Sequence, residues 1–452
     1  GLPNPRYPVP ACKRHGCSAL TDLLPLDVAR LVGYVKASNT DELDEFGFAV
    51  ALSRDATTLA VGAWGEGSTS IGVNGDETSN DLKFTGAVYV NVRDADGHWT
   101  KEAYIKAEQP SVARFAMSVA LSANGDTLAV NAWRRNSYRG ATYIFTRAAG
   151  AWSQEDILTA NHSGVNDEFG SSIALSNDGN VLAVGARKED GNGTSEENND
   201  LEDAGAAYIF ERSAGTWQQK AYLKASTPLA RNFFGSSVAL SGDGSTLAVA
   251  TTPGTGTVEI FVRTGDQWPS QQRLLAPNAD IGDAFGASIA LSDDGKTLAV
   301  GAPGEDSTAF DIGGDMESDQ ALDSGAVYIY TREGTSWNHQ AYVKATNTQN
   351  GDGFGVTVAL SSDGNVLAVG ASNEASAALG IGGDQADNQV PDAGAVYVYR
   401  RSNNIWASQS YLKPTNTGLS PKRFGFSLSL SGNAETLAIG APHEASGAIG
   451  IN

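Results

Sequence analysis

The sequence predicts an all-β fold, a seven-bladed β-propeller built from four-stranded antiparallel blades. Three observations predict it. A unit of 51–70 residues recurs about seven times. Each unit holds four short segments in which apolar residues alternate with small or polar ones, the period of two expected of strands. Radial repetition of four-stranded sheets leaves few exposed strand edges. The units begin with a Phe-Gly-type pair at Phe46, Phe115 (followed by Ala116), Phe169, Phe234, Phe285, Phe354 and Phe424.

The order of elements is clearest in the copy that spans residues 285–347. FGASIALS alternates as a first strand, SDDGK is typical of a tight hairpin turn, and TLAVGA returns as a second strand. A loop of variable length leads to the third strand, GAVYIY. The short turn TREGTS then precedes a fourth strand that runs from Trp337 through AYVKA.

The two ends of the chain predict how the ring closes. The third-strand segment occurs only six times, beginning at Gly86, Gly140, Gly205, Gly256, Gly325 and Gly394. Near the N-terminus, GYVKASN (33–39) matches the fourth-strand segment AYVKATN (341–347). We therefore expect residues before Phe46 to complete the blade of residues 424–440. The predicted domains are an N-terminal extension, 1–32, in which 18–24 could add one strand, and a propeller, 33–452.

Composition bounds the function. A net charge of −21 argues against nucleic acid, whose phosphates need a basic surface, and against adsorption to an anionic membrane. No apolar run approaches the roughly 18 residues of a membrane span.

Cys12 and Cys17 favour a small disulfide loop over a zinc site with His15, since a fourth zinc ligand is missing nearby. With Gly1 in place of an initiator methionine, we expect a processed extracellular or cell-surface protein, with the periplasm as an alternative.

The FG…GA units resemble the FG-GAP repeat family, the unit of the integrin α-subunit propeller and of many bacterial surface and secreted proteins. The resemblance covers residues 33–445 and implies a propeller used mainly for binding and adhesion. One departure matters. Integrin-type repeats carry a DxDxDG calcium loop between the first two strands, whereas the turns here read SNDGN, SGDGS, SDDGK or SSDGN. These turns are too short to wrap a cation with several oxygens, so the integrin calcium sites are not transferred.

Acidic residues recur at fixed places in the units. A glutamate follows the Gly-Ala signature at Glu66, Glu189, Glu305, Glu374 and Glu444, and an aspartate precedes the phenylalanine at Asp44, Asp167, Asp283 and Asp352. Units 2 and 4 have short loops and lack both, so the two carboxylates are expected to meet in space. Further acids occur at Asp76, Asp315 and Asp384 in the long loops and at Asp203, Asp323 and Asp392 before the third strand. One hypothesis is a Ca²⁺ site in each long-loop blade. The other is that these acids accept backbone N–H bonds and fasten the loops.

Unit 2 differs from the others. Its short loop carries Trp133, Arg134, Arg135, Tyr138 and Arg139, Arg114 precedes its phenylalanine, and Trp64 occupies the equivalent loop of unit 1. The loop joining strands two and three lies on the same face as the blade-to-blade linkers, so these residues are expected on one working face. Tryptophan faces stack on sugar rings or cations, and arginine forks hold carboxylates or sulfates. The alternative is that the arginines pair with loop carboxylates and Trp133 packs between blades.

These patterns favour an extracellular recognition or adhesion module that binds a glycan or a protein partner through the loop face, with Ca²⁺ as an optional cofactor. A polysaccharide-active glycosidase or lyase that uses loop carboxylates is an alternative, because such acid pairs are defined by geometry. A structural subunit of an extracellular assembly is a third hypothesis. No phosphate-binding loop, GxSxG motif or HExxH motif occurs, so no catalytic residue is assigned.

Overall fold

The computed structural model of the chain describes residues 33–41, 43–109, 111–193, 195–415 and 422–444. Residues 33–452 form one unit. The predicted Cys12–Cys17 disulfide and the expected strand at 18–24 lie outside the described residues. Within the described part of the chain, no helix is long and apolar enough to span a membrane.

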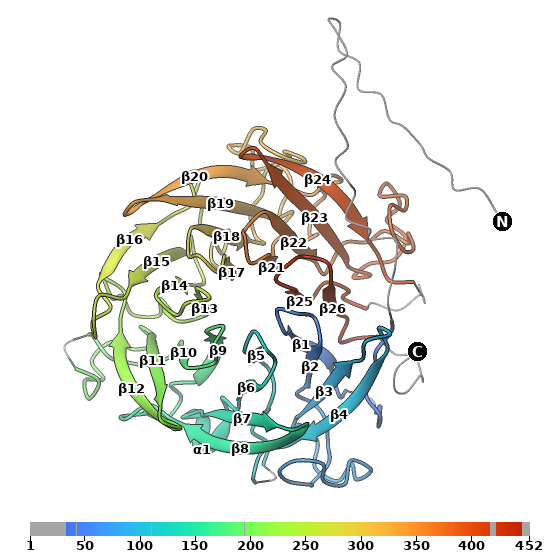
Figure 1. Ribbon diagram of the computed structural model, residues 1–452. Coiled ribbons are helices and arrows are strands. Elements are labelled where there is room, and N and C mark those ends of the chain that lie inside the picture. Colours follow the sequence, from blue (N-terminus) through green and yellow to red (C-terminus); the bar gives the residue numbers. More distant parts are fainter. Residues whose placement is uncertain (1–32, 42, 110, 194, 416–421, 445–452) are drawn as a thin grey trace, which may run out of the picture. The chain divides into compact units, whose positions relative to one another are not determined.

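Six four-stranded antiparallel sheets account for most of this unit (Figure 1). In each, four strands that follow one another along the chain pair in sequence order. Sheet 1 holds β1 (Phe46–Leu52), β2 (Thr58–Ala63), β3 (Ala87–Arg93) and β4 (Trp99–Ile105); sheet 2 holds β5 (Val119–Leu121), β6 (Thr127–Asn131), β7 (Thr142–Ala148) and β8 (Ala151–Leu158). Sheet 3 holds β9 (Phe169–Leu175), β10 (Val181–Ala186), β11 (Ala206–Ser213) and β12 (Thr216–Leu223); sheet 4 holds β13 (Ser237–Leu240), β14 (Thr246–Thr251), β15 (Thr257–Val262) and β16 (Ser270–Leu274).

Sheet 5 holds β17 (Ser288–Leu291), β18 (Thr297–Ala302), β19 (Ala326–Glu333) and β20 (Ser336–Val343); sheet 6 holds β21 (Thr357–Leu360), β22 (Val366–Ala371), β23 (Ala395–Ser402) and β24 (Ile405–Leu412). Strands β25 (Ser427–Leu430) and β26 (Leu437–Gly440) form a two-stranded sheet. The propeller of four-stranded blades is therefore confirmed. The count of seven such blades is not, because the described residues form six four-stranded sheets and this one pair. One short helical turn, α1 (Arg135–Tyr138), interrupts the β6–β7 loop.

The first strands line the inside of the ring (Figure 1). Each contacts the first strand of the next sheet, in the order β1, β5, β9, β13, β17, β21, β25 and back to β1. The hydrophobic core is divided among the spaces between neighbouring sheets. Between sheets 4 and 5, for example, Phe285 packs edge-on against Tyr328 at 5.4 Å. Because the sheets form a closed ring, every sheet has a neighbour on each side, and both of its apolar faces are buried.

The glycines of the repeat allow neighbouring sheets to approach closely. A Cβ atom on Gly301, in the TLAVGA strand β18, would lie 2.0 Å from the carbonyl oxygen of Gly355 in the next unit. The equivalent Gly440 in β26 lies in the same way against the carbonyl of Gly47, where the last unit meets the first. The two glycines of the FG…GA signature thus set the spacing between sheets, including the spacing at ring closure.

The turns between first and second strands form a closed ring of backbone hydrogen bonds at one face. Each N–H donates to the carbonyl of the equivalent residue in the following unit at 2.8–3.0 Å, through Arg54, Ala123, Asn177, Gly242, Asp293, Ser362, Gly432 and back to Arg54. Side chains add bonds between sheets that are not neighbours. The Arg54 guanidinium lies 2.5 Å from Asp293, whose other oxygen accepts a bond from Asn177 at 3.1 Å. The turns on this face are therefore linked to one another by hydrogen bonds all round the ring. The long loops lie at the opposite ends of the strands.

Candidate functional site

A buried ion pair recurs in every unit that carries a long loop. The glutamate after the Gly-Ala signature bonds a lysine that follows a fourth-strand segment. Lys344 lies 2.7 Å from Glu305, and the two side chains are 0% and 2% exposed. The other pairs are Lys106–Glu66, Lys224–Glu189, Lys413–Glu374 and Lys36–Glu444. The lysine of the last pair comes from residues 33–39 and its glutamate from the loop after β26.

Tyrosine, asparagine and aspartate complete this network. Around Glu305, the Tyr342 hydroxyl donates at 2.7 Å and the Asn278 amide donates at 3.2 Å. Asp283 accepts a bond from the backbone N–H of Asp280 at 2.9 Å. Burial, together with the nearby charge of Glu305, raises the pKa of Asp283 to about 6. The Asp and Glu of one unit thus lie close enough to interact.

The equivalent aspartates behave in the same way. Burial is the main cause that raises the pKa to about 6 at Asp44 and to about 7 at Asp167 and Asp352. The charge of the glutamate in the same unit also raises the pKa of each aspartate. Each aspartate side chain accepts a hydrogen bond from a backbone N–H three residues earlier. These bonds lie within the linker, and the long loop is joined to it by backbone bonds from Gly65 N–H to the Asp44 carbonyl and from Lys188 N–H to the Asp167 carbonyl.

The remaining acids of the calcium hypothesis lie apart from these pairs. Asp76, Asp315 and Asp384 are exposed, and each accepts a bond from the backbone N–H two residues later. Asp203, Asp323 and Asp392 have positive φ angles and offer their backbone carbonyls to the next linker. A Ca²⁺ ion takes six to eight oxygen ligands. In each unit the structure brings together only two carboxylates, one aspartate and one glutamate, and the glutamate already bonds a lysine ammonium. This set does not fit the ligand requirement of Ca²⁺. Calcium binding stays a prediction.

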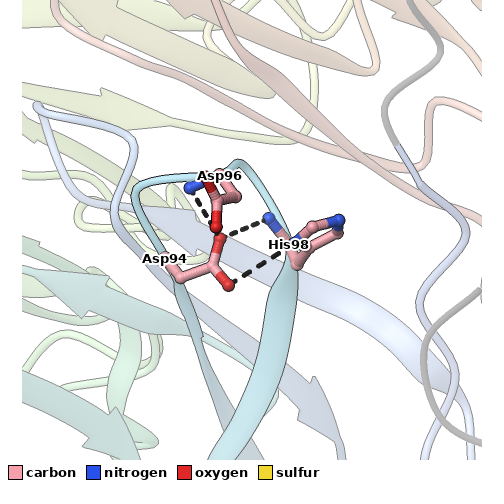
Figure 2. Close-up of side chains that lie close together, drawn as sticks. All are labelled: Asp94, Asp96 and His98. Atoms are coloured by element: carbon pink, nitrogen blue, oxygen red, sulfur yellow. Dashed lines mark hydrogen bonds and ion pairs between the residues drawn. The ribbon is translucent and has the colours of Figure 1, made fainter.

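One other group of potential metal ligands lies at the exposed β3–β4 hairpin. Asp94, Asp96 and His98 could each offer a ligand atom to a cation, and Figure 2 shows them side by side. Asp94 Oδ1 already accepts the backbone N–H groups of Asp96 at 3.0 Å and His98 at 2.8 Å, and these bonds lower the pKa of Asp94. These hydrogen bonds are those of a hairpin turn, so the closeness of the three side chains is explained without a metal.

The predicted aromatic and basic residues form two stacks on the loop side of sheets 1 and 2. In the first stack, Trp64 lies between Phe84 and Arg114. The rings of Trp64 and Phe84 are 5.5 Å apart and nearly parallel, and the Arg114 guanidinium lies 4.4 Å from the centre of the Trp64 ring. Trp64 is half-buried and is engaged by both groups, so it supports the Arg114 guanidinium through a cation–π contact.

Trp133 is the centre of the second stack. The Arg134 guanidinium lies 5.0 Å from the ring centres of both Trp133 and Tyr138, and Arg187 of sheet 3 lies 5.8 Å from the Trp133 ring. Trp133 is 9% exposed, and its indole N–H contacts the sulfur of Met117 at 2.7 Å. This tryptophan too is a support for cations.

Two predicted arginines are engaged elsewhere. Arg135 pairs with Glu108 at 3.1 Å, and Arg139 donates to the carbonyl of Ser163. The alternative in which the arginines pair with loop carboxylates therefore describes Arg135 but not Arg139, whose partner is a backbone carbonyl. The structure brings together Trp64, Arg114, Trp133, Arg134 and Tyr138 and adds Phe84, Met117 and Arg187.

Arg114 and Arg134 are neighbouring arginines without an acidic partner, a lack that they share with other described arginines such as Arg423, whose buried Nε is also unbonded. Neither makes an ion pair with any described residue, and the buried Nε atoms of both lack a hydrogen-bond acceptor. Burial, and then the charge of Arg134, lowers the pKa of Arg114. Positive φ at Arg114 recurs at the residue before the phenylalanine in every unit, from Glu45 to Arg423, and so belongs to the repeat, whereas the consecutive positive φ angles at Asn136, Ser137 and Tyr138 belong to unit 2. Strain of this kind, at about 1–3 kcal/mol per residue, persists where the surroundings hold it and gathers at functional sites.

Three residues of this cluster were missed by sequence reasoning. Phe84 lies at the far end of the same β2–β3 loop as Trp64, where units 3, 5 and 6 have an aspartate, and Met117 follows the Phe115-Ala116 pair. Arg187 was detectable, because it occupies in unit 3 the position of Trp64 and Trp133, directly after the Ala of the signature. Aligning that single position across the units places two tryptophans and an arginine on three consecutive sheets.

Comparison with known proteins agrees with the repeat. The family model described as the FG-GAP repeat matches residues 152–210 and 268–330. The chain contains FG-GAP repeats. Each match runs from the fourth strand of one sheet through the third strand of the next, so the predicted resemblance is confirmed. A search of curated protein sequences finds no significant match.

Solved structures share the architecture. A candidate 6-phosphogluconolactonase from Bacteroides uniformis aligns with a TM-score of 0.51 and 12% identity, over 82% of this chain and 86% of that chain. The periplasmic gluconolactonase of Pseudomonas aeruginosa aligns with a TM-score of 0.49 and 15% identity, over 87% and 88%. At such low identity the first likeness shows the propeller fold alone.

Proposed function

We propose that this chain is an extracellular recognition module that binds an anionic glycan through the loop side of sheets 1 and 2. The observation that carries the proposal is that two partly buried arginines without an ion-pair partner among the described residues, Arg114 and Arg134, lie near each other on aromatic rings in a chain of net charge −21. Guanidinium groups bind carboxylates and sulfates through paired N–H bonds, and a partly desolvated guanidinium gains most from such a partner.

The supporting residues favour a ligand with isolated charges. Stacking on Trp64, Trp133 and Tyr138 holds the two guanidinium groups in place, so little side-chain freedom is lost on binding. An acidic protein partner would meet the acidic remainder of the surface at many points. A glycan whose uronate or sulfate groups are separated by neutral hydroxyls would meet less repulsion.

The proposal extends to how the ring closes. We propose that residues 33–39 complete the two-stranded sheet as its outer strand. Lys36 bonds Glu444 at 3.0 Å as the lysines of the other units bond their glutamates, and Val35 and Ala438 of β26 pack against the same hydrophobic cluster. The recognition surface would then lie on a ring of seven blades.

A glycan array with uronate-containing, sulfated and neutral members tests the function. The purified chain is compared with the variant Arg114→Gln/Arg134→Gln and with Arg231→Gln, which removes an exposed arginine that already pairs with Glu202. We expect binding to acidic glycans only, lost in the double variant and kept in Arg231→Gln. Absence of any acidic glycan among the bound members, or equal binding by the double variant, would contradict the proposal.

A further inference from the structure

A second potential binding site lies on the same loop face, across the ring from sheets 1 and 2, between the long loops of sheets 5 and 6. A cleft of about 640 Å³ is bounded by Thr308 and Phe310 in the β18–β19 loop, by the linker 346–349, and by residues 383–386 in the β22–β23 loop. Thr346 and Gln385 also line a smaller cleft of about 250 Å³ beside β23 and β24. The cleft exists because two consecutive sheets here carry long loops.

Phe310 gives this cleft an uncovered aromatic ring. Its exposed fraction is 69%, and it makes no ring contact with any described aromatic residue. Trp64, by contrast, is half-buried and contacts Phe84 and Arg114. An exposed aromatic face can pack against the C–H face of a sugar ring without displacing protein groups.

The polar groups beside Phe310 are only partly used within the protein. Gln385 accepts a bond from Thr346 at 2.7 Å through Oε1, and its amide NH₂ has no partner among the described residues. Gln349 accepts from Asn388 through Oε1 in the same way. Asp384 accepts the N–H of Ala386 at 2.9 Å with one oxygen, which leaves the second oxygen to accept another bond.

Two amide donors and one carboxylate acceptor around an aromatic ring suit vicinal hydroxyl groups, which both donate and accept. No lysine, arginine or histidine lines the cleft, whereas Asp384 does. An anionic ligand would therefore be repelled here, unlike at Arg114 and Arg134. We propose that the cleft between the long loops of sheets 5 and 6 binds an uncharged oligosaccharide, independently of the anionic-glycan site.

Isothermal titration with a panel of neutral hexasaccharides, built from α-glucose, β-glucose, mannose or N-acetylglucosamine, tests this proposal. We expect at least one member to bind with a Kd in the millimolar range or tighter. Phe310→Ala and Gln385→Ala are each expected to weaken that binding about tenfold or more, as the loss of one good contact does. The matched control is Ile281→Ala, which truncates a 91% exposed side chain outside the cleft and should leave the Kd unchanged.

Phe310 is exposed and Gln385 is half-buried, and circular dichroism checks that each variant keeps the fold. Absence of binding by every member of the panel would overturn the proposal. So would equal binding by both cleft variants, or binding that depends on Arg114 and Arg134. The double arginine variant should retain neutral-sugar binding, so failure here and failure of the proposed function give different results.

Discussion

Replacing Lys344 by Met tests whether the buried Glu–Lys pairs hold the long loops. The ammonium bonds Glu305 and the Ser324 hydroxyl, both at 2.7 Å, and Lys344 is fully buried. Its removal leaves the Glu305 carboxylate buried beside Asp283 without a cation. Breaking a buried pair at one partner typically costs about 3–5 kcal/mol, so we expect a loss of that size in the free energy of unfolding. Urea unfolding at neutral pH, followed by tryptophan fluorescence, measures it.

Two comparisons complete this experiment. In Glu305→Gln/Lys344→Met both charges are gone, and we expect most of the lost stability to return, because no uncompensated buried charge remains. Lys296→Met removes an exposed lysine 3.6 Å from Asp294 and should change little. If Lys344→Met unfolded at the same urea concentration as the wild type, the ion pair would not fasten the loop and the reasoning would be refuted.

Three further predictions follow from the same contacts. Because the pKa of Asp352 is raised from 3.8 to about 7 in the folded state, its contribution to stability is lost as pH rises from about 4 through 7. The free energy of unfolding of Asp352→Asn should therefore be roughly 4 kcal/mol higher than that of the wild type at pH 8 and similar to it near pH 4, and a difference that does not change with pH would contradict this. Gly301→Ala should cost about 3 kcal/mol or more by clashing with the Gly355 carbonyl, whereas Gly334→Ala, with open space around its Cβ but φ of +61°, should cost roughly 1 kcal/mol in the same assay. Since ammonium groups compensate the buried glutamates, EDTA and added Ca²⁺ should leave the melting temperature unchanged, and a rise with Ca²⁺ would favour the calcium hypothesis instead.

Much of the fold follows from local pattern. Alternation in segments such as TLAVGA predicts strands, and the return of the same four segments predicts sheets stacked around an axis. The hydrogen-bonded ring of turns could not be predicted, because it is made by backbone groups of residues as different as Arg54, Ala123 and Gly242. Side-chain identity carries no signal for a backbone contact of this kind.

The partners of the repeated glutamates were predictable in principle. A lysine stands in the fourth-strand segment of every unit that has the glutamate, and Thr159 and Leu275 replace it in units 2 and 4, which lack the glutamate. The joint occurrence of this lysine and the glutamate in a unit is thus a sequence signal for the ion pair. The role of Trp64 could not be predicted, because whether its faces are open depends on how Phe84 and Arg114 pack against it.

The central claim is that Arg114 and Arg134 recognise an anionic group at the loop side of sheets 1 and 2. Biolayer interferometry with immobilised dextran sulfate and dextran tests it most directly, because the two polymers share a backbone and differ in charge. We expect binding to dextran sulfate and not to dextran, weakened about 100-fold or more in Arg114→Gln/Arg134→Gln by the loss of two charge-assisted contacts, and unchanged in Arg231→Gln. Equal binding of dextran sulfate by the double variant and the wild type would contradict it.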